Sequence, residues 1–244
     1  MRRLSVLVLV PLVGLVLAGC GERPSALTVE EGLSTVPPAA AVPVAADAIV
    51  LQDPEQAAET PVRLLTDETW LRTTAADSGI PVRALTAYAG AALLMSSVDP
   101  GCRLDWATLA GIGYVESRHG MIDGGELRED GRPTEPIYGP RLDGTYFDTV
   151  PDNDGGALDG DAEVDRAMGP LQIIPATWML WASNGWDPQN VDQQAVTAAR
   201  YLCDAGGDLS TESGWRAAIA AYNPAGSYAG KVAEAASRYA AKTT

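Results

Sequence analysis

One stretch of this chain, residues 109–120 (Leu-Ala-Gly-Ile-Gly-Tyr-Val-Glu-Ser-Arg-His-Gly), constrains its fold more than any other. A helix through it places Leu109, Ile112 and Glu116 on one stripe, so a carboxylate shares the face expected to point into the protein. Burial disfavours the charged form of a carboxyl group and raises its pKa. The stretch therefore predicts a glutamic acid that keeps its proton near neutral pH and can give it to a leaving oxygen.

Two glycines lie in the same predicted helix. Gly111 and Gly113 each cost about 1 kcal/mol relative to Ala in a helix interior, which favours positions where another backbone or a ligand comes close. The alternative is a helix whose end, from Ser117 to Gly120, turns to solvent and leaves Glu116 on its wet edge. The periodicity of one helix does not decide between the two.

The N-terminus has the layout of a secretory signal. Two arginines precede an apolar run, residues 4–18, which is too short to span a bilayer comfortably. The run ends in Leu-Ala-Gly-Cys20, which resembles a bacterial lipobox, where the cysteine is lipidated and becomes the mature N-terminus. We expect residues 1–19 to be a signal peptide and the protein to be anchored by lipid to the bacterial cell membrane, facing the wall. A single-pass membrane anchor is the alternative.

The two remaining cysteines are Cys102 and Cys203. An exported protein has little reason to keep two thiols reduced, so we expect them to form a disulfide. The alternative is a pair of free, buried thiols.

Charge and composition limit the partners. The chain carries a formal net charge of −15, and the loss of Arg2 and Arg3 with the signal makes the remainder more negative. This balance argues against nucleic acid or an anionic membrane surface as a partner. Residues 20–66 are predicted to be an extended tether, because residues 21–61 are rich in Ala, Pro and Val without a helical period. Residues 67–244 then have the size of one domain.

The predicted fold class of this domain is mainly α, because helical periodicity is clear and strand signals are sparse. We expect helices from Pro81 to Ser97, from a cap at Asp105 through Glu116, from Pro175 to about Gly185, from a cap at Asn190 to Cys203, through Trp215 to Tyr222, and through Tyr228 to Tyr239. Residues 121–165 lack a helical period, and an insertion of that length is usually functional or carries short strands.

Part of this insertion invites comparison with a calcium-binding loop. Asp152, Asp154 and Glu163 occupy positions 1, 3 and 12 of such a loop. Gly156 offers no side-chain oxygen at position 5, and Ala157 replaces the glycine required at position 6. We therefore expect a solvated acidic turn and no metal or cofactor. Zinc, and hydrolysis through a histidine, are disfavoured because the chain has a single histidine and no nucleophile elbow.

Three separated motifs together resemble a known family. They are residues 113–117 (Gly-Tyr-Val-Glu-Ser), 167–178 (Ala-Met-Gly-Pro-Leu-Gln-Ile-Ile-Pro-Ala-Thr-Trp) and 221–226 (Ala-Tyr-Asn-Pro-Ala-Gly). In this order they closely resemble the lytic murein transglycosylases of the membrane-bound B type, particularly their short actinobacterial relatives. The resemblance covers nearly all of residues 67–241. Larger members carry a calcium-binding insertion after the helix of Trp178; the corresponding segment here is too short to supply it.

The resemblance implies a lysozyme-like helical fold and cleavage of peptidoglycan glycan strands between N-acetylmuramic acid and N-acetylglucosamine. Glu116 maps onto the carboxyl group that acts first as acid and then as base. The muramoyl 6-hydroxyl closes on its own C1 and leaves a 1,6-anhydro end. Ser117, Gln172, Tyr222 and Asn223 map onto cleft positions that bind sugar or orient the acid, and Met168 maps onto an apolar wall.

The binding residues can also be interpreted as structural residues, and the chain also fits two other functions. From the residues alone, Gln172 and Asn223 fit helix caps, and Tyr222 and Met168 fit the core. Two other functions fit the chain: a muramidase that uses water and an acid between residues 148 and 165, and a non-catalytic lipoprotein that binds glycan.

Overall fold

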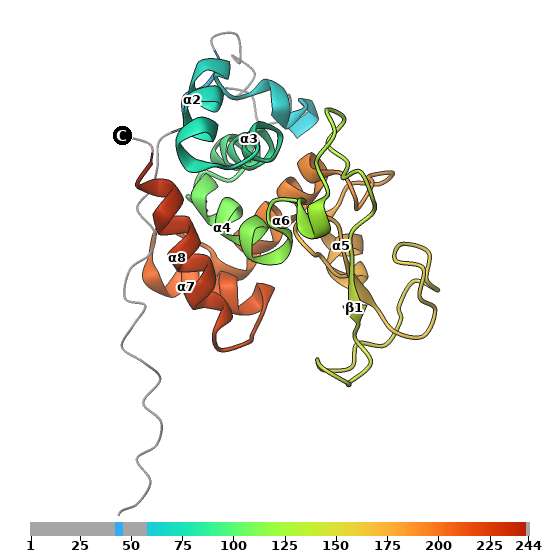
Figure 1. Ribbon diagram of the computed structural model, residues 1–244. Coiled ribbons are helices and arrows are strands. Elements are labelled where there is room, and N and C mark those ends of the chain that lie inside the picture. The colour runs from blue at the N-terminus through green and yellow to red at the C-terminus, as the bar shows by residue number, and fades with distance from the viewer. Residues whose placement is uncertain (1–41, 46–57, 243–244) are drawn as a thin grey trace, which may run out of the picture. The chain divides into compact units, whose positions relative to one another are not determined.

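The computed structural model describes residues 42–45 and 58–242 (Figure 1). The expected signal peptide, Cys20 and most of the tether lie outside them. The described part contains seven α-helices and one two-stranded sheet, which confirms the mainly α class. None of its helices combines the length and the hydropathy that crossing a membrane requires.

The helices follow one another around a long insertion. They are α2 (Glu68–Ser78), α3 (Val82–Val98), α4 (Trp106–Ser117), α5 (Pro175–Trp181), α6 (Val191–Gly206), α7 (Glu212–Tyr222) and α8 (Tyr228–Ala240). The shorter elements are the 3-10 turns η2 (Val62–Leu64) and η3 (Ile122–Gly124) and the strands β1 (Tyr138–Arg141) and β2 (Arg166–Met168).

Helix α4, which carries Glu116, is covered on nearly all sides. It packs against α3, α6 and α8, and every residue from 106 to 113 is buried (Figure 1). Leu109 and Ile112 point into the core as predicted. The sequence predicted one buried stripe on this helix. In the structure the opposite face is buried as well, because α3 and α8 both pack against α4. Only the last turn, which contains Glu116, keeps partial solvent access.

The two glycines of α4 lie at close approaches. A Cβ atom on Gly111 would lie 2.8 Å from the carbonyl oxygen of Val232 in α8. One on Gly113 would overlap the hydroxyl group of Tyr88 in α3. The prediction that another backbone comes close is confirmed at Gly111, whereas at Gly113 the close neighbour is a side chain.

The predicted caps and the disulfide are also present. Asp105 accepts a hydrogen bond from the backbone N–H of Ala107, and Asn190 caps α6 in the same way. Cys102 and Cys203 are joined, with their Cα atoms 5.2 Å apart. The bond fastens the chain just before α4 to the last turn of α6.

Helix α5 is shorter than expected: it ends at Trp181 because Ala182 leaves the helical conformation, with ψ at 152°. At the other end of the domain, residues 62–66, which composition assigns to the tether, lie against α3. Val62 and Leu65 are buried there, and Thr66 pairs with Val44. Gly90 of α3 permits this contact, since a Cβ on it would overlap the backbone of Val62.

The insertion carries the short strands that its length suggests. β1 pairs with β2 antiparallel, and Pro151 pairs with Val164 in an isolated bridge. In Figure 1 the insertion lies on the opposite side of the molecule from α7 and α8. Its strand β1 and turn η3 reach back toward the end of α4, and this brings them to Glu116.

Candidate active site

Glu116 lies in the last turn of α4 and is half-buried. The hydroxyl group of Tyr228, the first residue of α8, donates a hydrogen bond of 2.5 Å to its Oε1. Burial raises the pKa of Glu116 from 4.5 to about 7, and the Tyr228 bond acts in the opposite direction. The carboxyl group is therefore divided between its acid and base forms at neutral pH.

Two tyrosines support this carboxyl group. The rings of Tyr222 and Tyr228 stack with their centroids 6.4 Å apart and their planes 8° from parallel. Tyr222 donates from its hydroxyl group to the carbonyl oxygen of Leu171 at 2.7 Å. Burial, followed by the charge of Glu116, raises the pKa of both tyrosines, so both keep their protons and act as donors.

Glu116 lies in the wall of a cavity of about 440 Å³, which we call the Glu116 cavity. The insertion supplies most of its other walls. The lining residues are Glu116, Gly120, Ile122, Asp123, Gly125, Glu135, Pro136, Ile137, Tyr138, Gly139, Pro140 and Gln172. The cavity therefore forms where η3, β1 and the segment after β2 meet the end of α4.

Gln172 borders the Glu116 cavity and also a smaller one of about 110 Å³, lined in part by Thr177, Tyr201 and Tyr222. Its backbone adopts a left-handed conformation, with φ at 53°, and its Nε2 donates to the carbonyl oxygen of Gly169 at 2.9 Å. Gly139 leaves room for Oε1, which would lie 2.7 Å from a Cβ at that position. Gln172 thus presents a carboxamide between two cavities.

The structure gives the other predicted binding residues internal roles. Ser117 is buried, donates to the carbonyl oxygen of Pro170 at 2.5 Å and accepts from the N–H of Gly120. Met168 is fully buried in the core. Asn223 is half-buried and accepts from the N–H of Ala225, which closes the turn after α7. These three residues lie outside the lining of both cavities, so Gln172 and Tyr222 are the predicted binding residues that the fold brings to them.

His119 is close to Glu116 in sequence but faces the core. Its ring nitrogens lie 3.3 Å from the hydroxyl of Tyr88 and 2.8 Å from that of Tyr239. Burial, and then the charges of Arg238 and Arg118, lower its pKa to about 3. The histidine is therefore neutral and buried, which suits a structural role better than acid–base chemistry.

The acids that the sequence offered as partners for a hydrolytic mechanism lie elsewhere. Among the described acidic residues, those that line the Glu116 cavity are Glu116, Asp123 and Glu135. The acids between residues 148 and 165 belong to the far part of the insertion. A second carboxylate, if one takes part, comes from η3 or from the segment before β1.

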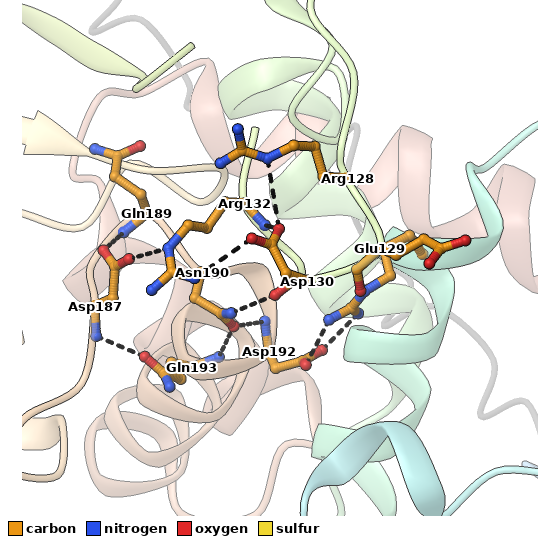
Figure 2. A network of polar contacts seen from close by, with 10 residues as sticks. Arg128, Glu129, Asp130, Arg132, Asp187, Gln189, Asn190, Asp192 and Gln193 are labelled. Atoms are coloured by element: carbon orange, nitrogen blue, oxygen red, sulfur yellow. Dashed lines mark hydrogen bonds and ion pairs between the residues drawn. The ribbon is translucent and has the colours of Figure 1, made fainter. Parts of the chain in front are cut away.

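A second polar cluster fastens the insertion to α6 (Figure 2). Arg83 of α3 forms a two-pronged ion pair with Asp192, at 2.6 and 2.7 Å. Arg132 pairs with Asp187 at 2.5 Å, and Asn190 donates to the carbonyl oxygen of Asp130. This cluster borders a cavity of about 450 Å³, but its charged groups are paired with one another. We assign it a structural role.

Tyr228 and Tyr138 are site residues that the sequence analysis did not select. Tyr228 was predicted only as part of its helix, and its ring stacks on Tyr222 as the ring of a core residue would. The sequence signal is its place two residues beyond the motif 221–226, where the following helix begins. The polar end of such a side chain becomes visible only when α8 is packed on α4.

Fold and site define a mainly helical protein whose half-buried carboxyl group, with a pKa near neutrality, faces a cavity. No family model, curated protein or solved structure matches the chain.

Proposed function

We propose that the protein is a peptidoglycan lytic transglycosylase of lysozyme-like fold. It cleaves the β-1,4 bond between N-acetylmuramic acid and N-acetylglucosamine and leaves 1,6-anhydromuramic ends. The observation that carries this proposal is Glu116, a half-buried carboxyl group with a pKa of about 7 in the wall of a cavity of about 440 Å³. The order of the three motifs around it supports the same assignment.

The chemistry requires one group that first gives and then takes a proton. Protonated Glu116 gives its proton to the glycosidic oxygen as the bond to C1 of the muramoyl ring breaks. The Glu116 carboxylate then accepts the proton of the muramoyl 6-hydroxyl while that oxygen bonds to C1. No water is consumed, and a second carboxylate is not required. The Tyr228 hydroxyl stabilises the carboxylate between the two steps.

The lining of the Glu116 cavity suits a neutral sugar chain. Gln172 offers a carboxamide for hydroxyl and acetamido groups, and Tyr138, which is 38% exposed, offers an aromatic side chain for contact with a sugar ring. Ser117 acts indirectly, because its hydrogen bond to the carbonyl oxygen of Pro170 holds the segment that carries Gln172. We assign it to positioning and not to direct binding.

A hydrolytic muramidase is the second candidate, because Asp123 and Glu135 line the same cavity as Glu116. A glycosidase that uses water, or an enzymic nucleophile, needs such a partner acid. A glycan-binding lipoprotein without activity is the third candidate. It would make no use of a proton held at neutral pH.

Substitution of the acid separates enzyme from binder. Glu116→Gln keeps the shape of the side chain but cannot give up and retrieve a proton, so turnover of purified peptidoglycan should fall by about 10²-fold or more while binding to sacculi persists. The matched controls are Asp123→Asn and Glu135→Gln, which should retain most activity. Full activity in Glu116→Gln would refute the assignment, and a control as inactive as Glu116→Gln would favour the muramidase.

We propose further that the protein is held at the cell membrane by lipid on Cys20, on the strength of the sequence motif. Replacement of Cys20 by Ala should move the protein from the membrane fraction to the soluble one. A variant that stays in the membrane with its apolar segment uncleaved would require the single-pass anchor instead.

A further inference from the structure

Three aspartates of the insertion meet at one point, at a distance from the Glu116 cavity. Asp152, Asp154 and Asp165 each offer one carboxylate oxygen, and these oxygens all lie within 4.8 Å of one another. We call them the Asp165 cluster. Oxygen ligands of calcium lie about 2.3–2.6 Å from the ion, so two ligands on opposite sides are about 4.6–5.2 Å apart. The oxygens of the cluster are therefore close enough together to bind one calcium ion.

Asp165 supplies an independent sign of a missing partner. The residue is 0% exposed, and within the described part of the chain no hydrogen-bond donor reaches its Oδ1. Its other oxygen, Oδ2, accepts from the side-chain amide of Asn153 at 2.8 Å. A buried carboxylate oxygen without a partner is costly, so structures rarely keep one unless a cation or a donor completes it.

The neighbouring Asp159 differs from Asp165 in its hydrogen bonding. It is also buried, but both of its oxygens are used, by the backbone N–H groups of Asp161 and Arg166. The nearby guanidinium of Arg141 pairs with Asp161 and Glu163, which do not belong to the cluster. Within the cluster, the oxygens of Asp152 and Asp154 accept from backbone N–H groups of their own turn, so the unsatisfied oxygen is the buried Oδ1 of Asp165.

The structure also corrects the alignment with a calcium loop that sequence suggests. Glu163, at the twelfth position, is 80% exposed and pairs with Arg141. Asp165, two residues later, is the carboxylate that turns inward. The left-handed turn falls at Gly155 and Gly156, one position before the site where Ala157 breaks the expected pattern. The Asp165 cluster is therefore not a twelve-residue calcium loop, and the requirements that Gly156 and Ala157 fail to meet apply to that loop alone.

We propose that Asp152, Asp154 and Asp165 bind one calcium ion through their carboxylate oxygens. This site lies before α5, in a different part of the chain from the insertion that larger proteins of the resembling family carry. The ion would stabilise the part of the insertion that leads into β2. The N–H of Asp165 bonds to Val150, its carbonyl oxygen accepts from Leu142, and the next residue begins β2.

Calcium binding is measurable without any assay of activity, so its failure would leave the proposed function untouched. The full chain, purified in detergent and stripped with a chelator, is titrated with calcium chloride by calorimetry. We expect one ion per chain, with an affinity at least that of extracellular calcium modules, whose Kd values are about 10⁻⁴–10⁻³ M. Calcium at about 10 mM should raise the melting temperature by roughly 3 °C or more. Magnesium chloride should bind much more weakly.

Matched variants test which carboxylates hold the ion. Asp165→Asn and Asp154→Asn should each weaken binding by about tenfold or more, whereas Glu163→Gln, which removes the same charge, should change it by less than about threefold. If Asp165→Asn does not fold, the half-buried Asp152 provides the same test as Asp152→Asn. The proposal is overturned by the absence of both heat and thermal shift in the wild-type protein. It is overturned equally by loss of binding in Glu163→Gln alone, or by magnesium binding as tight as calcium.

Discussion

Glu116 holds its proton because it is half-buried, and Tyr228 limits how firmly the proton is held. The hydrogen bond from Tyr228 favours the carboxylate, so it lowers a pKa that burial alone would raise further. Acid and base forms therefore lie close in free energy near pH 7, which suits a group that performs both roles in one turnover. The pair is local, but its members lie 112 residues apart in the sequence.

Tyr228→Phe tests this balance. Loss of the donor should raise the pKa of Glu116, so the alkaline limb of the kcat profile should move to higher pH. The carboxylate would also lose a hydrogen bond of about 1.5–3 kcal/mol, so kcat should fall by about tenfold or more. The control is Tyr201→Phe, because that hydroxyl donates to the carbonyl oxygen of Ala221 and not to Glu116. A profile that shifts equally in both variants would contradict the role of Tyr228.

The raised pKa of Glu116 also has a consequence for stability. Between the ordinary pKa of 4.5 and the folded value of about 7, the folded protein binds more protons than the unfolded chain, so the free energy of unfolding decreases as pH rises through this window. Glu116→Gln cannot titrate, so this decrease in the free energy of unfolding is absent in the variant. At pH 8 the variant should be more stable than the wild type by about 1–3 kcal/mol, discounted for partial exposure, and the difference should vanish near pH 4. Denaturant unfolding at the two pH values measures it, and a difference independent of pH would contradict the burial argument.

The sequence identified the acidic residue, but it did not show which way the neighbouring side chains point. Glu116 was found because a carboxylate on an apolar stripe is unusual. Ser117 was expected to bind sugar or to orient the acid, and its hydroxyl group donates to the carbonyl oxygen of Pro170, 53 positions away in the sequence. Glu163 and Asp165 differ in the same way, because Glu163 pairs with Arg141 at the surface and Asp165 is buried and accepts from Asn153. Periodicity within a segment carries no information about such distant partners.

Most helices with strong local signals were predicted, but α2 was missed although Asp67 caps its start and Gly79 ends it in a left-handed conformation. Pro175, Asp105 and Asn190 mark helix starts by their own chemistry, and the helices begin there. The burial of α4 on both faces depends on α3 and α8, which no local pattern reveals. The strands β1 and β2 are four and three residues long, too short to show an alternation. Residues 62–66 resembled the tether in composition but pack on α3.

The disulfide between Cys102 and Cys203 should contribute to stability more than to catalysis. It closes a loop with a sequence separation of 101, for which the chain-entropy treatment gives about 4.7 kcal/mol, although measured values are often smaller. A Cys102→Ala, Cys203→Ala double variant should melt at a clearly lower temperature and keep most activity at low temperature. The control is the wild-type protein with its disulfide reduced, which should melt at about the same lowered temperature as the double variant. Unchanged melting would deny the bond its energetic role.

On the scale of the whole molecule, the chain surrounds one buried helix and brings an irregular insertion to that helix's end. The helices supply the acid and its tyrosine donor, and the insertion supplies most of the cavity wall. This division explains why the helical class was predictable, whereas the cavity was not. The walls come from residues 120–140 and from Gln172, segments that lack a period and meet only in the folded chain.

In the proposed reaction, an internal hydroxyl group of the substrate takes the place of water. Its most direct test is the mass of the muropeptides released from purified peptidoglycan by the wild-type protein. An anhydromuramic end is one water lighter than a reducing muramic end. We expect anhydro products to predominate and to disappear in Glu116→Gln. Predominantly reducing ends, together with an equal requirement for Asp123 or Glu135, would contradict the transglycosylase and establish a muramidase in its place.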